Sequence, residues 1–216
     1  MLQTVNNAMK ILRLYSIEKQ ELQIGEIAEE LGLSEITTYR LVTTLAKYGY
    51  LEKKYRYSGG YQLGISTLKL SGIIKMHWKT YREEVRPILE KLNKALDKTV
   101  HFGILEGKNI VYLEKYESSN PIRLTSHIGS NIPAYCTASG LVILAFSNNI
   151  IIKSVLPPKL VSFGPNTITS HETLKSKLKG IKQQGYYIAI EETHKGVISI
   201  AVPVRDFTNK VIGCNC

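Results

Sequence analysis

The stretch LGLSEITTYRLVTTLAKYGYLEKK, from Leu31 to Lys54, decides how the N-terminal part of this chain folds. Gly32 stands between two helical patterns, where a helix end favours the positive φ that glycine adopts most easily. Ser34 is a suitable N-cap for the next helix, which we expect to run from Glu35 to Tyr48. Two helices joined by such a short turn predict a helix-turn-helix.

The sequence on either side supplies the other elements of this domain. Apolar residues recur with helical spacing in residues 5–16 and 23–31, so both segments are expected to be helices. After Gly49, two short β-like runs, YLEKKY and GYQLG, are joined by RYSGG, which is typical of a hairpin turn. This order predicts a winged helix-turn-helix rather than a generic three-helix bundle with a hairpin.

The charges of the chain change sign at the glycine turn. The 216 residues carry a net charge of +10, which favours an anionic partner. From Glu18 to Glu35 there are six acids and one base, whereas Ile36 to Leu63 holds five bases and one acid. An ordinary solvated surface mixes the two signs, so the segregation indicates that one surface faces a polyanion.

The third helix and the wing are therefore expected to contact double-stranded DNA. In this fold the third helix enters the major groove and its N-terminal residues reach base edges. Arg40 would bond a phosphate or a guanine edge, and Thr37 and Thr44 would bond phosphates. The predicted DNA contacts are Ser34, Glu35, Ile36, Thr37, Arg40, Thr43, Thr44, Lys53, Lys54, Arg56 and Tyr57.

The rest of the chain predicts a helical connection followed by an α+β domain. Helical patterns fill residues 63–97 with more apolar residues than one small domain needs, so we expect a linker helix and a dimer at least. Pro87 fits an early turn or a kink, not a helix centre. Beyond Thr99, several β-like runs surround expected helices at 136–146 and 171–185, with a loop at 153–169. This pattern favours a mainly antiparallel sheet with helices beside it.

Two features of the sequence bear on the compartment. No apolar run approaches the length of about 18 to 20 residues that a membrane helix needs. The start, MLQTVNNAMKILRLY, is amphipathic and lacks the apolar region and cleavage site of a signal peptide. The sequence therefore predicts a cytoplasmic protein.

Other site chemistries are weaker in this sequence. Cys214 and Cys216 would share one face of a strand. With Cys136 or a histidine they are candidates for a zinc site or a redox sensor, but buried inert thiols fit the spacing better. The paired Glu191 and Glu192 have no motif-linked nucleophile or second carboxylate. The histidines lack metal-ligand spacing; they include His101, His127, His171 and His194. We predict no catalytic residue, no metal and no cofactor.

The chain resembles the IclR family of transcriptional regulators over almost its whole length. The matching stretches are IAEELGLSEITTYRLVTTLAKYGYLEK, YQLGISTLKLSG, SHIGSNIPAYCTASGLVILA and GYYIAIEETHKGVISIAVPVRDFTNKVIG. The resemblance implies a winged-helix DNA-binding domain at residues 1–63, a linker helix at 64–80 and a GAF-like effector-binding domain at 81–216. It also implies homodimers, often paired as tetramers, on partly palindromic operators near a promoter.

The resemblance also implies an effector pocket over the second-domain sheet. The family positions fall on Gly129, Thr137, Ala138 and Ser199, and we add Ser130 from the same tight loop. The first serine of the family's closing strand falls on Cys216, and the second lies past the end of this sequence, which leaves open a C-terminal truncation. A small-residue helix start favours an anion, so we expect a small organic acid, aromatic acids included.

Two classes of function follow. The first is a ligand-responsive transcriptional regulator that binds a promoter operator. The second is a GAF-type small-molecule-binding or enzymatic module whose winged helix serves protein contacts. The bases of the wing and Arg40 favour the first.

Overall fold

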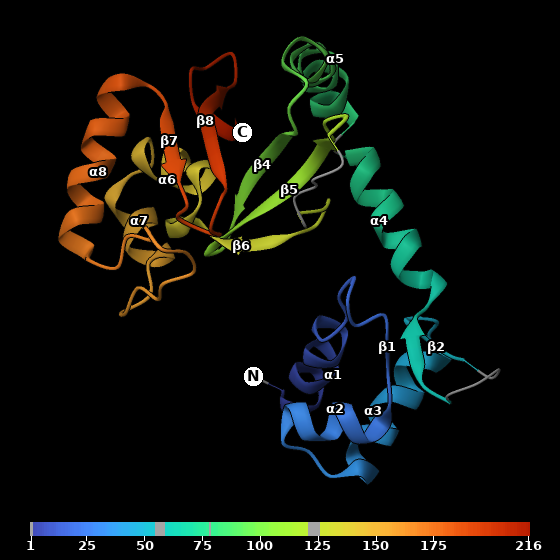
Figure 1. The fold of residues 1–216 in the computed structure, drawn as a ribbon. Helices are drawn as coiled ribbons and strands as arrows, with labels where there is room; N and C mark the ends of the chain where they lie inside the picture. Colours follow the sequence, from blue (N-terminus) through green and yellow to red (C-terminus); the bar gives the residue numbers. More distant parts are fainter. Residues whose placement is uncertain (1, 55–58, 78, 121–125) are drawn as a thin grey trace. The chain divides into compact units, whose positions relative to one another are not determined.

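The computed structural model describes residues 2–54, 59–77, 79–120 and 126–216 (Figure 1). Its contacts divide the chain into two compact units, Met1–Thr80 and Tyr81–Cys216, and each is considered by itself. Within the described ranges, no helix is both long enough and apolar enough to cross a membrane.

The first unit is a winged helix-turn-helix, as predicted. Its three helices are α1 (Gln3–Arg13), α2 (Ile24–Leu31) and α3 (Glu35–Lys47). Its antiparallel sheet has the order β1-β3-β2, with bounds β1 (Glu21–Leu22), β2 (Leu51–Lys53) and β3 (Tyr61–Leu63). Strand β1 was not expected from the sequence; it pairs with β3 and so ties the segment before α2 to the wing.

Local signals explain where these helices begin and end. Gly32 adopts a φ of 62° at the end of α2, the left-handed conformation predicted for it. Gln23 and Glu26 form a capping box at the start of α2. The buried core that holds the helices to the wing includes Ile11, Ile27, Leu41, Val42 and Leu51.

Two helices follow the wing, α4 (Ile65–His77) and α5 (Lys79–Leu96). Pro87 lies in the middle of α5, so the prediction that it would avoid a helix centre is wrong. Proline has no N–H, so Pro87 cannot donate a hydrogen bond to the preceding turn. The helix continues because Leu89, which is buried, and Val85 and Leu92 pack on the second-unit sheet.

The second unit contains a six-stranded antiparallel sheet with the order β6-β5-β4-β9-β8-β7. The strands are β4 (Val100–Glu106), β5 (Asn109–Tyr116), β6 (Asn131–Pro133), β7 (Tyr187–Ile190), β8 (Ile198–Arg205) and β9 (Val211–Asn215). The last strand, β9, enters the middle of the sheet between β4 and β8. This order confirms the predicted α+β class.

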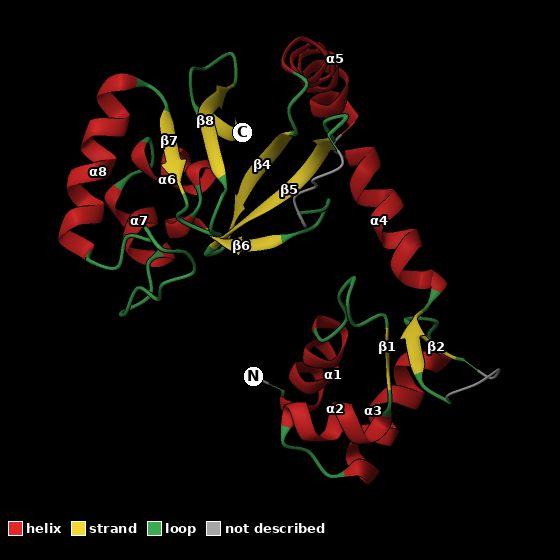
Figure 2. Ribbon diagram, in the orientation of Figure 1, coloured by secondary structure: helices red, strands yellow, loops and turns green. Residues whose placement is uncertain are grey.

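Helices cover both faces of this sheet. Helix α5 packs on one face through Leu89, while the other face carries the main core, which includes Ile110 and Leu141 (Figure 2). The elements on that second face are η1 (Ala134–Cys136), α6 (Ala138–Ala145), α7 (Asn149–Val155) and α8 (His171–Gln184). Helix α7 corrects the loop expected from residue 153 onward, because it continues to Val155.

Candidate DNA-binding and effector sites

The start of α3 is built by a reciprocal contact between two predicted DNA-binding residues. Ser34 Oγ accepts from the backbone N–H of Thr37 at 3.3 Å and donates to Thr37 Oγ1 at 2.9 Å. These bonds satisfy an N–H that the helix start leaves without an intrahelical acceptor. Glu35 follows at the first position of α3, where an acid favours the positive end of the helix dipole.

The two faces of α3 divide as the helical period predicts. Thr38, Leu41 and Val42 are buried, so they hold α3 against the rest of the first unit. Ile36 and Arg40 are exposed on the opposite face, and the Arg40 guanidinium makes no ion pair with any described residue. Tyr39, which was not among the predicted contacts, is 54% exposed on the same helix. Its large exposed ring is the signal that marks it as a further DNA-contact candidate.

Two threonines of α3, Thr43 and Thr44, donate their hydroxyl protons to the helix itself. Thr43 Oγ1 donates to the carbonyl of Tyr39 at 2.8 Å, and Thr44 Oγ1 donates to the carbonyl of Arg40 at 2.7 Å. Such bonds to the preceding turn are common for threonine inside a helix. A phosphate that accepts from Thr44 therefore has to displace this bond, whereas Thr37 accepts from Ser34 and keeps its own hydroxyl proton.

The wing presents its bases from the end of β2. Lys53 is exposed, and Lys54 Nζ lies 3.4 Å from Glu21 Oε2 of β1. An exposed pair of this kind is worth less than about 1 kcal/mol, so a DNA phosphate can replace Glu21 as the partner of Lys54. The predicted contacts Arg56 and Tyr57 lie outside the described residues.

The tight loop expected at Gly129 and Ser130 is present in the second unit. Gly129 has a φ of 86°, and its N–H donates to the carbonyl of Tyr112 at 2.8 Å. Ser130 Oγ accepts from the N–H of His127 at 2.8 Å, which closes the turn. The loop is thereby fixed to strand β5.

The start of α6 offers fewer free polar groups than the sequence suggested. Thr137 caps the helix, because its Oγ1 accepts from the N–H of Gly140 at 3.0 Å. Ala138 is 2% exposed and belongs to the core. Ser139 is the exception: its side chain is 1% exposed, and its hydroxyl faces the hydroxyl of Tyr112 and the thiols of Cys214 and Cys216.

Ser139 faces a cluster of hydroxyl and thiol groups from three strands. It lies close enough to Tyr112 of β5 and to Cys214 and Cys216 at the end of β9 to lower their pKa values. Burial has the larger effect, because it raises the pKa of Cys214 to about 12 and also raises the pKa of Tyr112. Ser199 of β8 contacts Cys216 in the same way as Ser139 does.

His101 extends this cluster along β4. Its ring centroid lies 4.5 Å from that of Tyr112, and its Nε2 lies 2.8 Å from Ser126 Oγ. Its backbone pairs with Cys216 through two hydrogen bonds of 2.7 and 3.0 Å. We call Tyr112, Ser139, Ser199, Cys216 and His101 the sheet cluster. Of the predicted effector residues, the structure brings Ser199 and Cys216 together here, whereas Gly129, Ser130, Thr137 and Ala138 serve the surrounding loop and helix start.

The cysteine and paired-glutamate candidates from the sequence lie in surroundings that suit a role in packing rather than in chemistry. Within the residues that the structure describes, no group of three or more His, Cys, Asp or Glu side chains is placed to hold a metal ion. Cys136 is buried, and burial raises the pKa of its thiol to about 12, so the thiol stays protonated and unreactive. Glu192 follows β7 and accepts a hydrogen bond from the hydroxyl of Tyr187, while burial raises the pKa of its carboxyl.

Both halves of the chain match known protein families. Residues 4–54 match the IclR helix-turn-helix domain, and residues 76–214 match the bacterial transcriptional regulator IclR C-terminal domain. The HTH-type transcriptional regulator XynR of Escherichia coli is 32% identical over 98% of this chain and 83% of its own length. KdgR of the same organism is 30% identical over 97% of this chain and 80% of its own length.

Solved structures agree with these matches. The IclR protein of Thermotoga maritima is 27% identical, has a TM-score of 0.69 and covers the whole of this chain and 86% of its own. An IclR homolog from Microbacterium hydrocarbonoxydans, solved with 4-hydroxybenzoate, has the same fold, with a TM-score of 0.83 at 21% identity over 99% of this chain and 88% of its own. The chain therefore belongs to the IclR family of transcriptional regulators, which bind DNA through their helix-turn-helix, carry an effector-binding C-terminal domain and are not enzymes.

Proposed function

We propose that this protein binds a promoter operator through α3 and the wing, and that it responds to a small organic acid bound at the sheet cluster. The observation that carries the first part is the exposed face of α3. It presents Ile36, Tyr39 and Arg40 outward, while the buried face fixes the helix in place. The guanidinium of Arg40 forms no ion pair with a residue that the structure describes. A rigid helix with an uncommitted arginine suits the major groove.

Replacing Arg40 with alanine tests this part. If Arg40 reads a guanine, the variant should bind the operator less tightly by about 1 to 3 kcal/mol, and it should lose its preference at a single base pair. If it bonds a phosphate, affinity should fall on all sequences and the salt slope should drop by about one unit. Mobility-shift titrations at several salt concentrations, on an operator selected from random DNA by the wild-type protein, separate the two cases.

The matched control for this experiment is Lys108→Ala, which removes an exposed cation in the turn between β4 and β5 of the second unit. We expect it to leave operator affinity unchanged. Equal affinity of wild type and Arg40→Ala would remove Arg40 from the DNA interface.

We further propose a homodimer, or a pair of dimers, as the DNA-bound form. One winged helix reads too few bases for specific binding. Helix α4 supports this proposal, since several large apolar side chains on it are exposed: Ile65, Leu68, Leu70, Ile73, Ile74 and Met76. On this proposal residues 1–63 bind DNA, residues 64–80 link the domains and residues 81–216 bind the effector.

The effector proposal rests on the buried hydroxyl of Ser139 and the polar groups around it. A ligand that accepts from these groups would gain hydrogen bonds worth about 0.5 to 1.5 kcal/mol each. The neighbouring groups are the hydroxyls of Tyr112 and Ser199 and the thiol of Cys216, so the cluster offers donors to a carboxylate but no side-chain cation. The complex of the Microbacterium homolog with 4-hydroxybenzoate supports an aromatic acid as the first compound to test.

Calorimetry with 4-hydroxybenzoate and a panel of small organic acids tests this proposal. We expect Ser139→Ala to weaken binding by about 1 kcal/mol, roughly five-fold, because one hydrogen bond to the ligand is lost. Ser176→Ala, at an exposed position of α8, is the control and should bind like the wild type. Equal ligand affinity of wild type and Ser139→Ala would place the effector elsewhere.

A further inference from the structure

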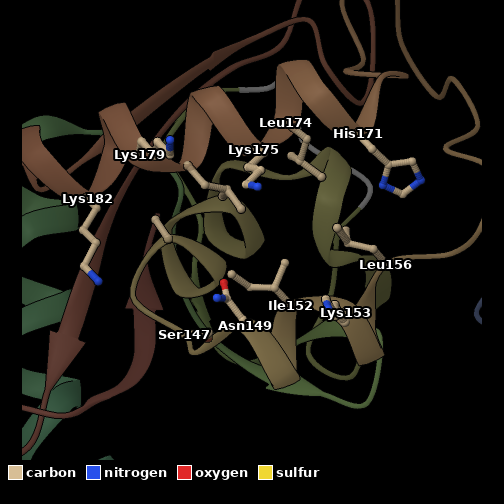
Figure 3. Close-up of a pocket in the computed structure, with 12 residues that line it drawn as sticks. Ser147, Asn149, Ile152, Lys153, Leu156, His171, Leu174, Lys175, Lys179 and Lys182 are labelled. Atoms are coloured by element: carbon tan, nitrogen blue, oxygen red, sulfur yellow. The ribbon is translucent and has the colours of Figure 1, made fainter.

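A cavity lies on the outside of the second unit, between α7 and α8 (Figure 3). Its volume is about 500 Å³, within the range of about 300 to 1,000 Å³ found for small-molecule sites. None of the residues of the sheet cluster lines it, so it is separate from the proposed effector site.

The floor of this cavity is apolar. Ala145, Leu174 and Leu178 belong to the buried core, and Ile152 and Leu156 pack against the same core from α7 and its end. Side chains from α8 and from α7 face the same space (Figure 3). A hydrated anion alone would leave this apolar surface in contact with water, so the floor favours a ligand with an apolar body.

The rim of the cavity is cationic. Lys175, Lys179 and Lys182 lie on one face of α8 with spacings of four and three residues, and Lys153 comes from α7. None of these four ammonium groups forms an ion pair or a hydrogen bond with a described residue. Their mutual repulsion is therefore uncompensated within the described chain, and a bound anion would relieve it.

The sequence around the cavity has the same bias. Residues 145–185 contain six lysines and a single acid, Glu172. A solvated helix face usually mixes both signs at the spacing of one turn. Asn149 adds a side-chain amide to the rim, and His171 Nε2 lies 3.2 Å from the carbonyl of Pro158.

We propose that this cavity, the lysine groove, is a second ligand site for a small organic phosphate with an apolar body. Lysine is a common phosphate ligand, and several unpaired ammonium groups match the double charge of a phosphate monoester. The apolar concave floor argues against the backbone of a nucleic acid, which is convex and polar. A second copy of this chain also fits poorly, because its net charge is +10.

The test uses the full chain and phenyl phosphate as the probe, with inorganic phosphate measured alongside. Calorimetry should show that phenyl phosphate binds more tightly than inorganic phosphate, by roughly ten-fold or more, because the ring covers the apolar floor. The double variant Lys175→Gln/Lys179→Gln should lose at least about ten-fold in phenyl phosphate affinity. The control variant Lys98→Gln/Lys108→Gln, at exposed lysines outside the groove, and Ser139→Ala should both bind phenyl phosphate like the wild type.

Several results would overturn the proposal. Absence of phenyl phosphate binding at roughly millimolar concentration, or equal affinity for inorganic phosphate, would reduce the groove to a basic surface. A weaker binding of non-specific DNA by the groove variant would assign the lysines to nucleic acid instead. Loss of phenyl phosphate binding in Ser139→Ala would move the ligand to the sheet cluster.

Discussion

Replacing Gly140 with alanine is expected to lower the unfolding free energy of the second unit by more than about 3 kcal/mol. A Cβ at this position would lie 2.0 Å from the carbonyl oxygen of Ala134 and 2.5 Å from that residue's carbonyl carbon and Cα. These are backbone atoms of η1, so they cannot rotate away as the end of a side chain can. The N–H of Gly140 also donates to Thr137 Oγ1, and a shift of α6 would break this cap.

The same change should disturb the sheet cluster, because Ser139 is the residue before Gly140. Gly180→Ala is the matched control: it lies inside α8, and nothing stands within 4 Å of its added Cβ. Alanine there should stabilise the protein by roughly 0.5 to 1 kcal/mol, because glycine is the weaker helix former. Urea unfolding, with hydrogen exchange measured on peptides from β4 and α6, distinguishes the two. Equal stability of Gly140→Ala and the wild type would contradict this prediction, because it would mean that the backbone of η1 moves aside without loss of unfolding free energy.

The sequence was most informative where one residue determines a local conformation. Gly32 and Gly185 both adopt positive φ at helix ends, and Ser34 caps α3, as their residue types predict. The sequence did not predict helix α7, because its three consecutive isoleucines show no helical period. Its cap was nevertheless readable, since Asn148 Oδ1 accepts from the N–H of Ile151.

Tertiary context explains the other differences. Strand β1 has two residues and no pattern of its own, and it exists because β3 offers it an edge. Pro87 remains helical because the packing of α5 on the sheet outweighs the lost hydrogen bond. In each case the deciding partner is distant in the sequence.

The candidate sites show the same division. The outward face of α3 follows from helical spacing alone, although the bond from Thr44 to the carbonyl of Arg40 depends on a rotamer that no spacing reveals. The sheet cluster requires knowing that β9 inserts beside β4, which places Cys216 against His101. Tyr112 and His101 were therefore not predicted as site residues, because neither lies in a motif and their proximity arises only from the strand order.

His101 is expected to make the second unit sensitive to acid. The side chain is 4% exposed, and burial lowers the pKa of its imidazole from 6.5 to about 4, with a smaller contribution from Lys115 on the neighbouring strand. In the unfolded chain the imidazole takes up a proton near pH 6.5, whereas in the folded protein it stays neutral down to about pH 4. The stabilisation is thus complete above pH 6.5 and is lost as the pH falls toward 4. Over this interval the loss should be about 3 kcal/mol.

Urea unfolding of wild type and His101→Gln between pH 7 and pH 4 measures this contribution. Glutamine cannot titrate, and its amide can still reach Ser126, which now lies 2.8 Å from the imidazole Nε2. We expect the variant to be less stable than the wild type at pH 7, because the ring contact with Tyr112 is lost, and the gap to narrow by about 3 kcal/mol at pH 4. His194→Gln, at an exposed position, should follow the wild-type curve throughout. Parallel curves for wild type and His101→Gln would show that another group, rather than the buried imidazole, governs the acid response.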